Sequence, residues 1–339
     1  MKAVRYHRHG GPEVLVFEDV RDPEPGPQEI LVRVRAAALN RMDTRMRSGG
    51  WPPPRILGAD AAGDVAALGP NVAGPKVGDR VIIYPGISCG NCEFCDAGQH
   101  NWCSSYKLLG TQLDGGYAQY VIAPAINARP IPKGMGYIEA ATLPICITTS
   151  WRVLFTKGQL RAGEWVMIHS AGSGVSVFAS QMAKLAGAVV VTTTSTAEKE
   201  AKAKELGADH VINYRREDVA TRVQELTEGR GVDLVIDHVG QATWAFSIGS
   251  LRKGGRMVTL GATSGALHPL NIFDLYRSEI SILASGSHTR SDFDNGMRLV
   301  HQGRIRPVID SVFALKEAAA AHQRLEAGLH FGKIALEVP

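Results

Sequence analysis

Four cysteines near residue 90 form the pattern in this sequence with the clearest chemical meaning. Their spacing is Cys-x2-Cys-x2-Cys-x7-Cys. Four thiolates at such spacing can close a tetrahedron around Zn²⁺, and this leaves no coordination position for a substrate. The pattern predicts one structural Zn²⁺ per chain. The alternatives are an iron–sulfur cluster, since four cysteines also ligate iron, and four unligated buried thiols. The expected ligands are Cys89, Cys92, Cys95 and Cys103.

A second chemical pattern is a turn of small residues between an apolar run and an amphipathic segment. The run Trp165–Ile168 predicts a buried strand, and the segment after the turn has helical periodicity. Backbone N–H groups at a helix N-terminus suit a pyrophosphate. Ala171, Ser173 and Ser176 break the strict G-x-G-x-x-G pattern, so an unrelated βα turn is the alternative. The residues expected to bind the pyrophosphate are Gly172, Ser173, Gly174 and Val175.

The next apolar run bears on the choice of nicotinamide cofactor. It starts at Ala188 and ends in threonines and Ser195, without an Asp or Glu. Domains that prefer NAD place an acid there to bind the ribose 2′-OH, whereas hydroxyl groups can donate to a 2′-phosphate. This end of the strand therefore favours NADPH.

The length and composition of the chain indicate the class of protein to which it belongs. A chain of 339 residues suffices for two domains, and 45% hydrophobic with 21% charged residues is ordinary for a soluble protein. The net charge of +4, without a basic run, argues against nucleic acid as a partner. The sequence has no secretory h-region and no apolar run that could span a membrane, so we expect a cytoplasmic protein without a membrane partner.

The order of predicted elements indicates an α/β protein with two domains. Residues 1–126 contain closely spaced strands such as Glu29–Ala36, which predict a β-rich, barrel-like domain. From about residue 127, six strands alternate with helices or loops, as in a Rossmann-type doubly wound parallel sheet. We assign 127–288 to this dinucleotide-binding domain. Residues 289–339, with a helix near Leu315–Glu326 and a strand at Ile334–Val338, return to the first domain.

These features together resemble the medium-chain dehydrogenase/reductase superfamily along essentially the whole chain. The resemblance implies a GroES-like first domain, and the four-cysteine lobe is typical of its zinc alcohol dehydrogenases. Those enzymes hold a second, catalytic zinc with three ligands. Here Asn40, Ala59 and Ile145 stand at the ligand positions, and Cys146 is one residue away from the third. We therefore expect no catalytic zinc.

The departures match the quinone oxidoreductase-like branch of the superfamily. The stretches Ala38–Thr44 and Leu57–Asp60 resemble its Ala-Leu-Asn-x-x-Asp-Thr and Leu-Gly-x-Asp segments. By the same resemblance, Lys199 and Tyr214 would clamp a 2′-phosphate, Thr149 would pack beside the nicotinamide ring, and Lys333 is included among the cofactor-binding residues. A solvated Lys199 is the alternative. Two turns that follow predicted strands would flank the nicotinamide ribose, because ligands bind at the carboxyl ends of strands; they contribute Val239, Gly240, Gly261 and Ala262.

Without a catalytic metal, hydrogen-bond donors must stabilise the charge that develops on the substrate oxygen. The amide of Asn40 could donate, and Arg45 could supply positive charge, as could Arg41 on the same segment. Asp43 and Asp60 would orient neighbours or be plain loop carboxylates. We interpret His288 as a loop histidine rather than a catalytic one.

Three hypotheses about function follow from these residues. The first is an NADPH-dependent reductase of activated C=C bonds or quinones, such as enones, enals or enoyl thioesters. The second is a zinc-type NAD(P)-dependent alcohol dehydrogenase, and the third is an NADPH-binding sensor or structural protein with little turnover. The partners we expect are a small-molecule substrate and further copies of the chain. The run Ile280–Leu283 resembles the edge strand through which this superfamily forms dimers, so we expect a homodimer or a dimer of dimers.

Overall fold

The computed structural model describes residues 1–339, which divide into two compact units. The first unit comprises Met1–Thr148, His288–His301 and Pro307–Pro339. The second comprises Thr149–Ser287 and Gln302–Arg306. None of the helices is long and apolar enough to cross a membrane.

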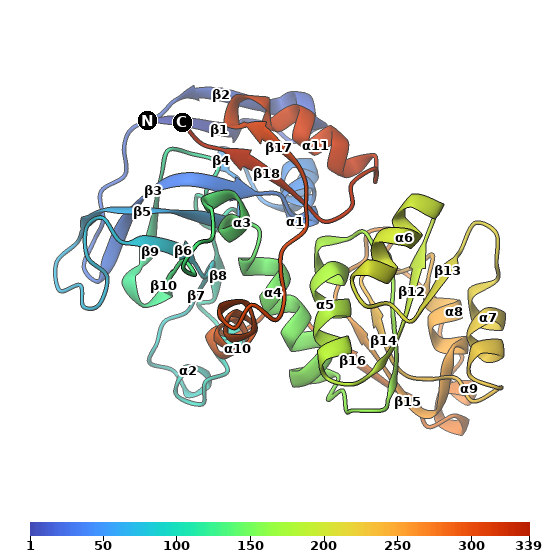
Figure 1. Cartoon of the computed structure of the whole chain (residues 1–339). Helices are drawn as coiled ribbons and strands as arrows, with labels where there is room; N and C mark the ends of the chain where they lie inside the picture. Colours follow the sequence, from blue (N-terminus) through green and yellow to red (C-terminus); the bar gives the residue numbers. More distant parts are fainter. The chain divides into compact units, whose positions relative to one another are not determined.

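The first unit is organised around β3 (Glu29–Ala38), the long strand shown in blue in Figure 1. It lies inside a seven-stranded sheet with the order β10-β6-β5-β3-β18-β17, and β9 also pairs with β3. Ile30, Val32 and Val34 alternate with less buried residues and point into the core, as a half-buried strand requires. The remaining strands are β5 (Asp60–Leu68), β6 (Arg80–Ile83), β9 (Tyr120–Pro124), β10 (Ala128–Pro130), β17 (Ile309–Ala314) and β18 (Lys333–Glu337).

Two small sheets and six helices complete the first unit. One sheet has the order β2-β1-β4 and the other pairs β7 with β8. The strands are β1 (Lys2–Tyr6), β2 (Leu15–Asp19), β4 (Arg55–Ile56), β7 (Gly86–Ile87) and β8 (Lys107–Leu108). The helices are α1 (Arg41–Arg45), α2 (Glu93–Asp96), α3 (Tyr137–Ala141), α4 (Pro144–Trp151), α10 (Arg290–His301) and α11 (Ala318–Glu326); the last residues of α4 belong to the second unit.

Residues 127–148 lie with the first unit, although the sequence assigned them to the dinucleotide-binding domain. The physical reason is pairing: β10 joins the main sheet through β6, and α3 packs on β3 and β5. The predicted strand at Ile334–Val338 is confirmed as β18. The sequence did not predict β17, which pairs in parallel with β18.

The second unit is a six-stranded, fully parallel sheet with the order β13-β12-β11-β14-β15-β16. Strand order reverses between β11 and β14, and ligands bind at such a switch point in doubly wound sheets. The Rossmann-type fold predicted from the sequence is confirmed. The strands are β11 (Trp165–Ile168), β12 (Val189–Thr194), β13 (His210–Asn213), β14 (Val232–Asp237), β15 (Leu251–Thr259) and β16 (Ser281–Ala284).

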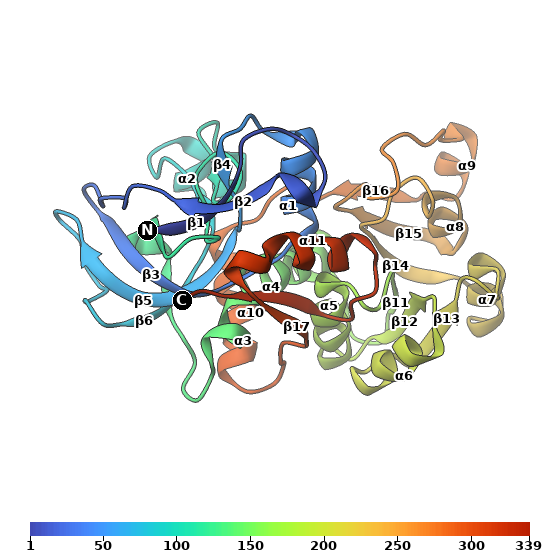
Figure 2. The ribbon, with the colours of Figure 1, turned by 90° about the horizontal axis from the view of Figure 1, so that it is seen from above.

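Helices cover both faces of this parallel sheet, so its central strands are buried and apolar. Figures 1 and 2 show α5 and α6 on one face, with α7 and α8 on the other. Every residue of β14 is buried, which explains the apolar Val232 and Leu234–Ile236. The two aspartates of this strand are hydrogen-bonded, Asp233 to Arg230 and Asp237 to Thr243. The helices are α5 (Gly174–Leu185), α6 (Ala197–Glu205), α7 (Val219–Leu226), α8 (Trp244–Gly249) and α9 (Ile272–Arg277).

Candidate functional site

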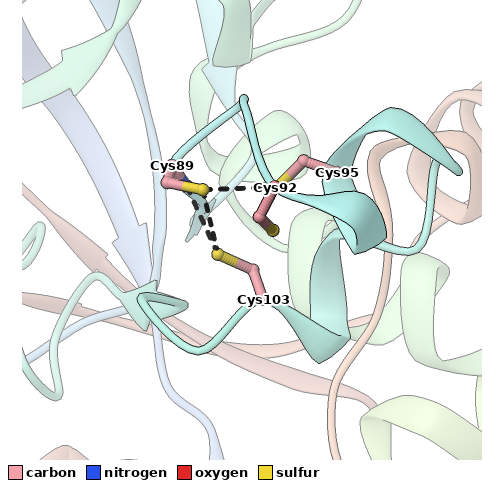
Figure 3. Close-up of side chains that lie close together, drawn as sticks. All are labelled: Cys89, Cys92, Cys95 and Cys103. Atoms are coloured by element: carbon pink, nitrogen blue, oxygen red, sulfur yellow. Dashed lines mark hydrogen bonds between the residues drawn. The ribbon is translucent and has the colours of Figure 1, made fainter.

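The four cysteines converge in the loop between β7 and β8 of the first unit, as Figure 3 shows. Their sulfur atoms all lie within 4.8 Å of one another. The Sγ of Cys89 is 3.5 Å from that of Cys103 and 3.9 Å from that of Cys95. A tetrahedral Zn²⁺ with Zn–S bonds of about 2.3 Å separates its sulfurs by about 3.8 Å. The cluster therefore fits a structural zinc.

Local backbone geometry brings these sulfurs together. Gly90 and Gly98 adopt positive φ angles of 81° and 72°, which let the chain reverse tightly beside the cluster. Cys92 caps the short helix α2, which carries Cys95. The compact arrangement surrounds a single ion, whereas an iron–sulfur cluster spreads its cysteines over several iron atoms.

A second polar cluster of the first unit is buried where α1, β5 and β18 begin. Asn40 immediately precedes α1 as its N-cap residue. Its Nδ2 donates to Oδ2 of Asp60 at 3.0 Å. The ammonium of Lys333 donates to Oδ1 of Asn40 at 2.8 Å and to Oδ2 of Asp60 at 2.9 Å. The other carboxylate oxygen of Asp60 accepts the backbone N–H of Ile145 at 2.8 Å.

By the resemblance, zinc alcohol dehydrogenases hold catalytic zinc at the positions of Asn40, Ala59 and Ile145, and Asn40 is part of this cluster. Ala59 and Ile145 offer no side-chain ligand, and burial raises the pKa of the Cys146 thiol to about 11. Burial opposes the charge of Lys333, but the attraction of Asp60 holds its pKa above the ordinary value. A Zn²⁺ ion here would face a buried ammonium group and a protonated thiol. The residues present do not fit a catalytic zinc.

A buried hydrogen-bonded chain continues from this cluster towards the surface. Asp43 accepts the backbone N–H of Asn40 at 2.7 Å, and Tyr117 donates its hydroxyl to Asp43 at 3.3 Å. The Tyr117 hydroxyl also lies 3.3 Å from Nε2 of His322, which contacts Arg47 through Nδ1 at 3.2 Å. Burial raises the pKa of Asp43 to about 7 and lowers that of His322 to about 3. Asp43 is thus a positioning group for the start of α1 rather than a plain loop carboxylate.

The other residues of the expected catalytic set have different surroundings. Arg45 is exposed at the end of α1, and Thr149 is half-buried in α4, within the second unit. Their catalytic roles remain predictions. His288 lies on a loop, as expected, and is buried; its Nδ1 lies 3.3 Å from the hydroxyl of Tyr84 in the first unit.

The small-residue turn of the second unit leads from β11 into α5. Ser173 is the N-cap, and its Oγ accepts the backbone N–H of Ser176 at 3.0 Å. The N–H groups of Gly174 and Val175 donate to no protein acceptor. The serine that breaks the glycine pattern thus caps the helix without using these donors. The turn fits a pyrophosphate at the N-terminus of α5.

A histidine that the sequence did not single out lies against this turn. Nε2 of His238 is 3.2 Å from Oγ of Ser173 and 3.0 Å from Oγ of Ser176. Beneath it, Ser247 bridges Nε2 of His169 and Oδ2 of Asp237, at 2.7 Å on each side. Burial lowers the pKa of His169 to about 4, so its imidazole is neutral at pH 7.

The residues expected to bind a 2′-phosphate lie near the adjacent ends of β12 and β13. The backbone N–H of Tyr214 donates to the carbonyl of Thr194 at 3.1 Å, and Ser195 follows Thr194 directly. Lys199 is in the first turn of α6, and Glu198 of the same turn pairs with Lys202 at 2.8 Å. The buried hydroxyl of Thr194 has no hydrogen-bond partner in the protein.

The two turns expected beside the nicotinamide ribose pack against each other after β14 and β15. Both N–H groups of Val239 and Gly240 donate to Oδ1 of Asp237, at 2.9 and 3.0 Å. A Cβ added at Gly240 would lie 2.6 Å from the carbonyl oxygen of Gly265, and one at Gly261 would lie 2.7 Å from that of His238. Glycine is therefore required at both positions, next to Ala262.

The comparisons with known proteins agree with this architecture. Residues 26–133 match the alcohol dehydrogenase GroES-like domain, and residues 174–302 match the zinc-binding dehydrogenase family. The chain is 33% identical to a quinone oxidoreductase of Pseudomonas aeruginosa over 96% of both chains. It is 32% identical to an acryloyl-coenzyme A reductase of Sulfurisphaera tokodaii, over 94% of this chain and 95% of the relative. A solved NAD-dependent alcohol dehydrogenase superposes with a TM-score of 0.96 at 42% identity over all of both chains.

Proposed function

The chain belongs to the medium-chain dehydrogenase/reductase superfamily and is an oxidoreductase, and we propose that it reduces an activated C=C bond or a quinone with NADPH, without a catalytic metal. The substrates in this class are enones, enals and enoyl thioesters as well as quinones. The proposal concerns the reaction and the cofactor, and it rests on residues of each unit separately.

The observation that carries the proposal is the buried cluster of Asn40, Asp60 and Lys333. Of the three positions expected to hold a catalytic zinc, only that of Asn40 carries a polar side chain, and its amide is hydrogen-bonded to the ammonium group of Lys333 and to Asp60. Oxidation of an alcohol needs a Lewis acid that lowers the pKa of the hydroxyl, or a general base that accepts its proton. The ammonium group of Lys333 and the amide of Asn40 supply neither. Reduction of an enone needs only donors to the carbonyl oxygen. Two relatives, named as a quinone oxidoreductase and an acryloyl-coenzyme A reductase, also support a reductase of quinones or activated C=C bonds.

The division of labour in this reaction follows from the groups available. Nicotinamide, when bound, supplies the hydride. Asn40 would donate its side-chain N–H to the substrate carbonyl oxygen, where negative charge develops after hydride reaches the β-carbon. A proton from water then completes the saturated product.

Support for NADPH comes from the ends of β12 and β13. No acid occupies the strand end, and Ser195, Lys199 and Tyr214 supply two hydroxyl groups and one ammonium group near Thr194. Glu198 is the first acidic residue after the end of β12, and it is paired with Lys202. Hydroxyl and ammonium donors suit a 2′-phosphate, which a carboxylate would repel.

A substrate panel tests the proposed function directly. NADPH oxidation is followed by absorbance with quinones, enones, enoyl-CoA and aldehydes, and alcohols are offered with NADP⁺ and NAD⁺ in parallel. We expect turnover with alkenes or quinones and none with alcohols. Turnover confined to alcohols and dependent on added Zn²⁺ would establish the alcohol dehydrogenase, and cofactor binding without turnover would establish a sensor or structural protein.

We also propose that the protein assembles as a homodimer or a dimer of dimers. Strand β16 is the last strand of the parallel sheet and has β15 as its one neighbour. Ile282 and Leu283 on it are only half-buried, and Ile272, Phe273 and Tyr276 of α9 are exposed. An apolar edge of this kind is satisfied by pairing with its own copy.

A further inference from the structure

We propose that Lys333 is a positioning residue for the reduction: it locks the side-chain amide of Asn40 with its N–H group towards the substrate and replaces the charge of the missing metal. This inference rests on the proposed function, since it assigns a role in that reaction. It concerns side chains of the first unit alone.

The ammonium group of Lys333 is held in one position by its hydrogen bonds. Its three N–H groups are all used, by Leu39 O at 2.7 Å, Asn40 Oδ1 at 2.8 Å and Asp60 Oδ2 at 2.9 Å. Its side chain is only 3% exposed, and it begins β18, where the N–H of Lys333 donates to Val308. An ammonium with three acceptors at these distances is held in one place.

The second step is what this contact does to the amide of Asn40. An ammonium has no acceptor, so Oδ1 and not Nδ2 must face Lys333. One N–H of Nδ2 then donates to Asp60, and the other donates to no group of the protein. The side chain of Asn40 thus presents one uncommitted donor in a fixed orientation, which is what stabilisation of a developing oxyanion requires.

The third step is electrostatic. A buried positive charge that binds Oδ1 draws electron density away from the amide nitrogen, which makes the remaining N–H a stronger donor. Asp60 compensates the charge of Lys333 and accepts a hydrogen bond from Asn40, so the three side chains hold one another in fixed positions. Lys333 and Asp60 thus polarise the amide of Asn40, whereas the zinc enzymes of the superfamily polarise the substrate oxygen with a metal ion.

The sequence suggested a different role for Lys333, as a cofactor-binding residue. The two roles make different predictions for variants. A positioning residue acts through Asn40, so its removal lowers kcat only while Asn40 is present. A cofactor contact weakens NADPH binding whether Asn40 is present or not.

A double-mutant cycle distinguishes these roles. The substitutions Lys333→Met and Asp60→Asn are introduced together, so that both buried charges are removed and neither is left uncompensated. It is made in the wild-type chain and in the Asn40→Ala chain, and Lys316→Met, at an exposed lysine of the same unit, is the control. We expect kcat for an enone to fall by about tenfold to a hundredfold in the wild-type background. In the Asn40→Ala background the same pair should change kcat by less than about threefold, because interacting residues are not additive.

NADPH affinity, measured by fluorescence titration, should stay within about twofold of wild type in all variants. A weakened NADPH affinity with retained kcat, or an equal fall of kcat in both backgrounds, would overturn the proposal. Circular dichroism and zinc content establish that each variant is folded.

A spectroscopic readout separates this inference from the proposed function. In protein labelled with ¹⁵N-asparagine, the Asn40 side-chain signals are identified by their loss in Asn40→Ala. We expect the amide proton that is bonded to Asp60 to exchange slowly with water in wild type. When the pair is removed, both Asn40 signals should shift and this proton should exchange faster. If wild type reduces no alkene or quinone, the proposed function fails, and these signals still decide whether Lys333 locks the amide; unchanged signals would contradict it.

Discussion

The ammonium of Lys333 lies 2.9 Å from a carboxylate oxygen of Asp60, across 273 residues of chain. Their side chains are 3% and 0% exposed. Both charges have therefore lost nearly all contact with water, and each depends on the other for compensation. The start of the last strand of the first unit is in this way fixed to the start of β5.

The first prediction is that Asp60→Ala strongly destabilises the protein. It leaves the Lys333 ammonium buried without a counter-charge, and such a loss costs about 3–5 kcal/mol of unfolding free energy. Urea denaturation measures the change. The double variant Asp60→Ala with Lys333→Met should regain much of the loss, because no unpaired charge remains. Asp19→Ala is the matched control, because its ion pair with Lys2 is exposed and its removal should matter little.

The second prediction concerns the pH dependence of stability through Asp43. Burial raises its pKa to about 7 in the folded protein, against about 3.9 in an unfolded chain. Between these values the folded state holds the proton more tightly, so this group's contribution to the unfolding free energy is full below about pH 4 and is lost as the pH rises through about 7. The groups that act on it are Asp60, Lys333, Tyr117 and the N–H groups of Asn40 and Gly58.

The test compares wild type with Asp43→Asn by urea unfolding at pH 5, 6, 7 and 8. The amide side chain of this variant cannot titrate, so wild type should have its largest advantage at pH 5 and lose part of it by pH 8. His322 and the surface carboxylates are common to both proteins and cancel in the difference. A difference that is independent of pH would show that Asp43 does not titrate in this range.

The third prediction is that Lys199→Ala weakens NADPH and leaves NADH nearly unchanged. Losing a charge-assisted contact with the 2′-phosphate costs about 1.5–3 kcal/mol, which is a loss of roughly tenfold to 150-fold in affinity. Lys204→Ala is the control on the same helix, because Lys204 pairs with Glu200. Equal losses for both cofactors would show that Lys199 does not read the 2′-phosphate.

Much of the second unit could be predicted because its information is local. The continuous apolar run of β11 and the small-residue turn before α5 each specify an element within a few residues. The predicted strand at Trp165–Ile168 agrees with the bounds of β11. Strand β17 was missed because its residues are half-buried, apart from the exposed Val312, and give neither an apolar run nor a clean alternation.

The polar cluster of the first unit could be predicted only in part. The resemblance indicated that Asn40 replaces a metal ligand, but Asp60 stayed open between an orienting role and a plain loop carboxylate. What decides between them is the contact with Lys333, and no local pattern encodes a pairing over such a separation. The sequence offered one signal that could have found it: an acid in a buried apolar stretch requires a cation nearby.

The fourth prediction concerns assembly through β16. A lysine in place of Ile282 puts a charge on the apolar edge, and this should dissociate a dimer that pairs β16 with its copy. Light scattering at micromolar concentration should report a multiple of 36.4 kDa for wild type and a smaller assembly for Ile282→Lys. Val312→Lys, at an exposed position of β17 in the first unit, is the control. A wild-type monomer under these conditions would refute the proposed assembly.

The last prediction is one zinc per chain, structural and not catalytic. The four sulfurs within 4.8 Å close a tetrahedral shell, so the ion offers no position to a substrate. Because a structural zinc is coupled to the folding of its lobe, Cys92→Ser should lower both metal content and local order around residues 89–103, and should reduce activity only through that loss. Cys146→Ser is the matched control, because Cys146 is equally a free cysteine but lies outside the cluster, and its variant should retain the full zinc content. Elemental analysis of the purified proteins decides the question. Two tightly bound zincs per chain, with turnover abolished by removing one while the fold stays intact, would overturn the metal-free mechanism and favour an alcohol dehydrogenase.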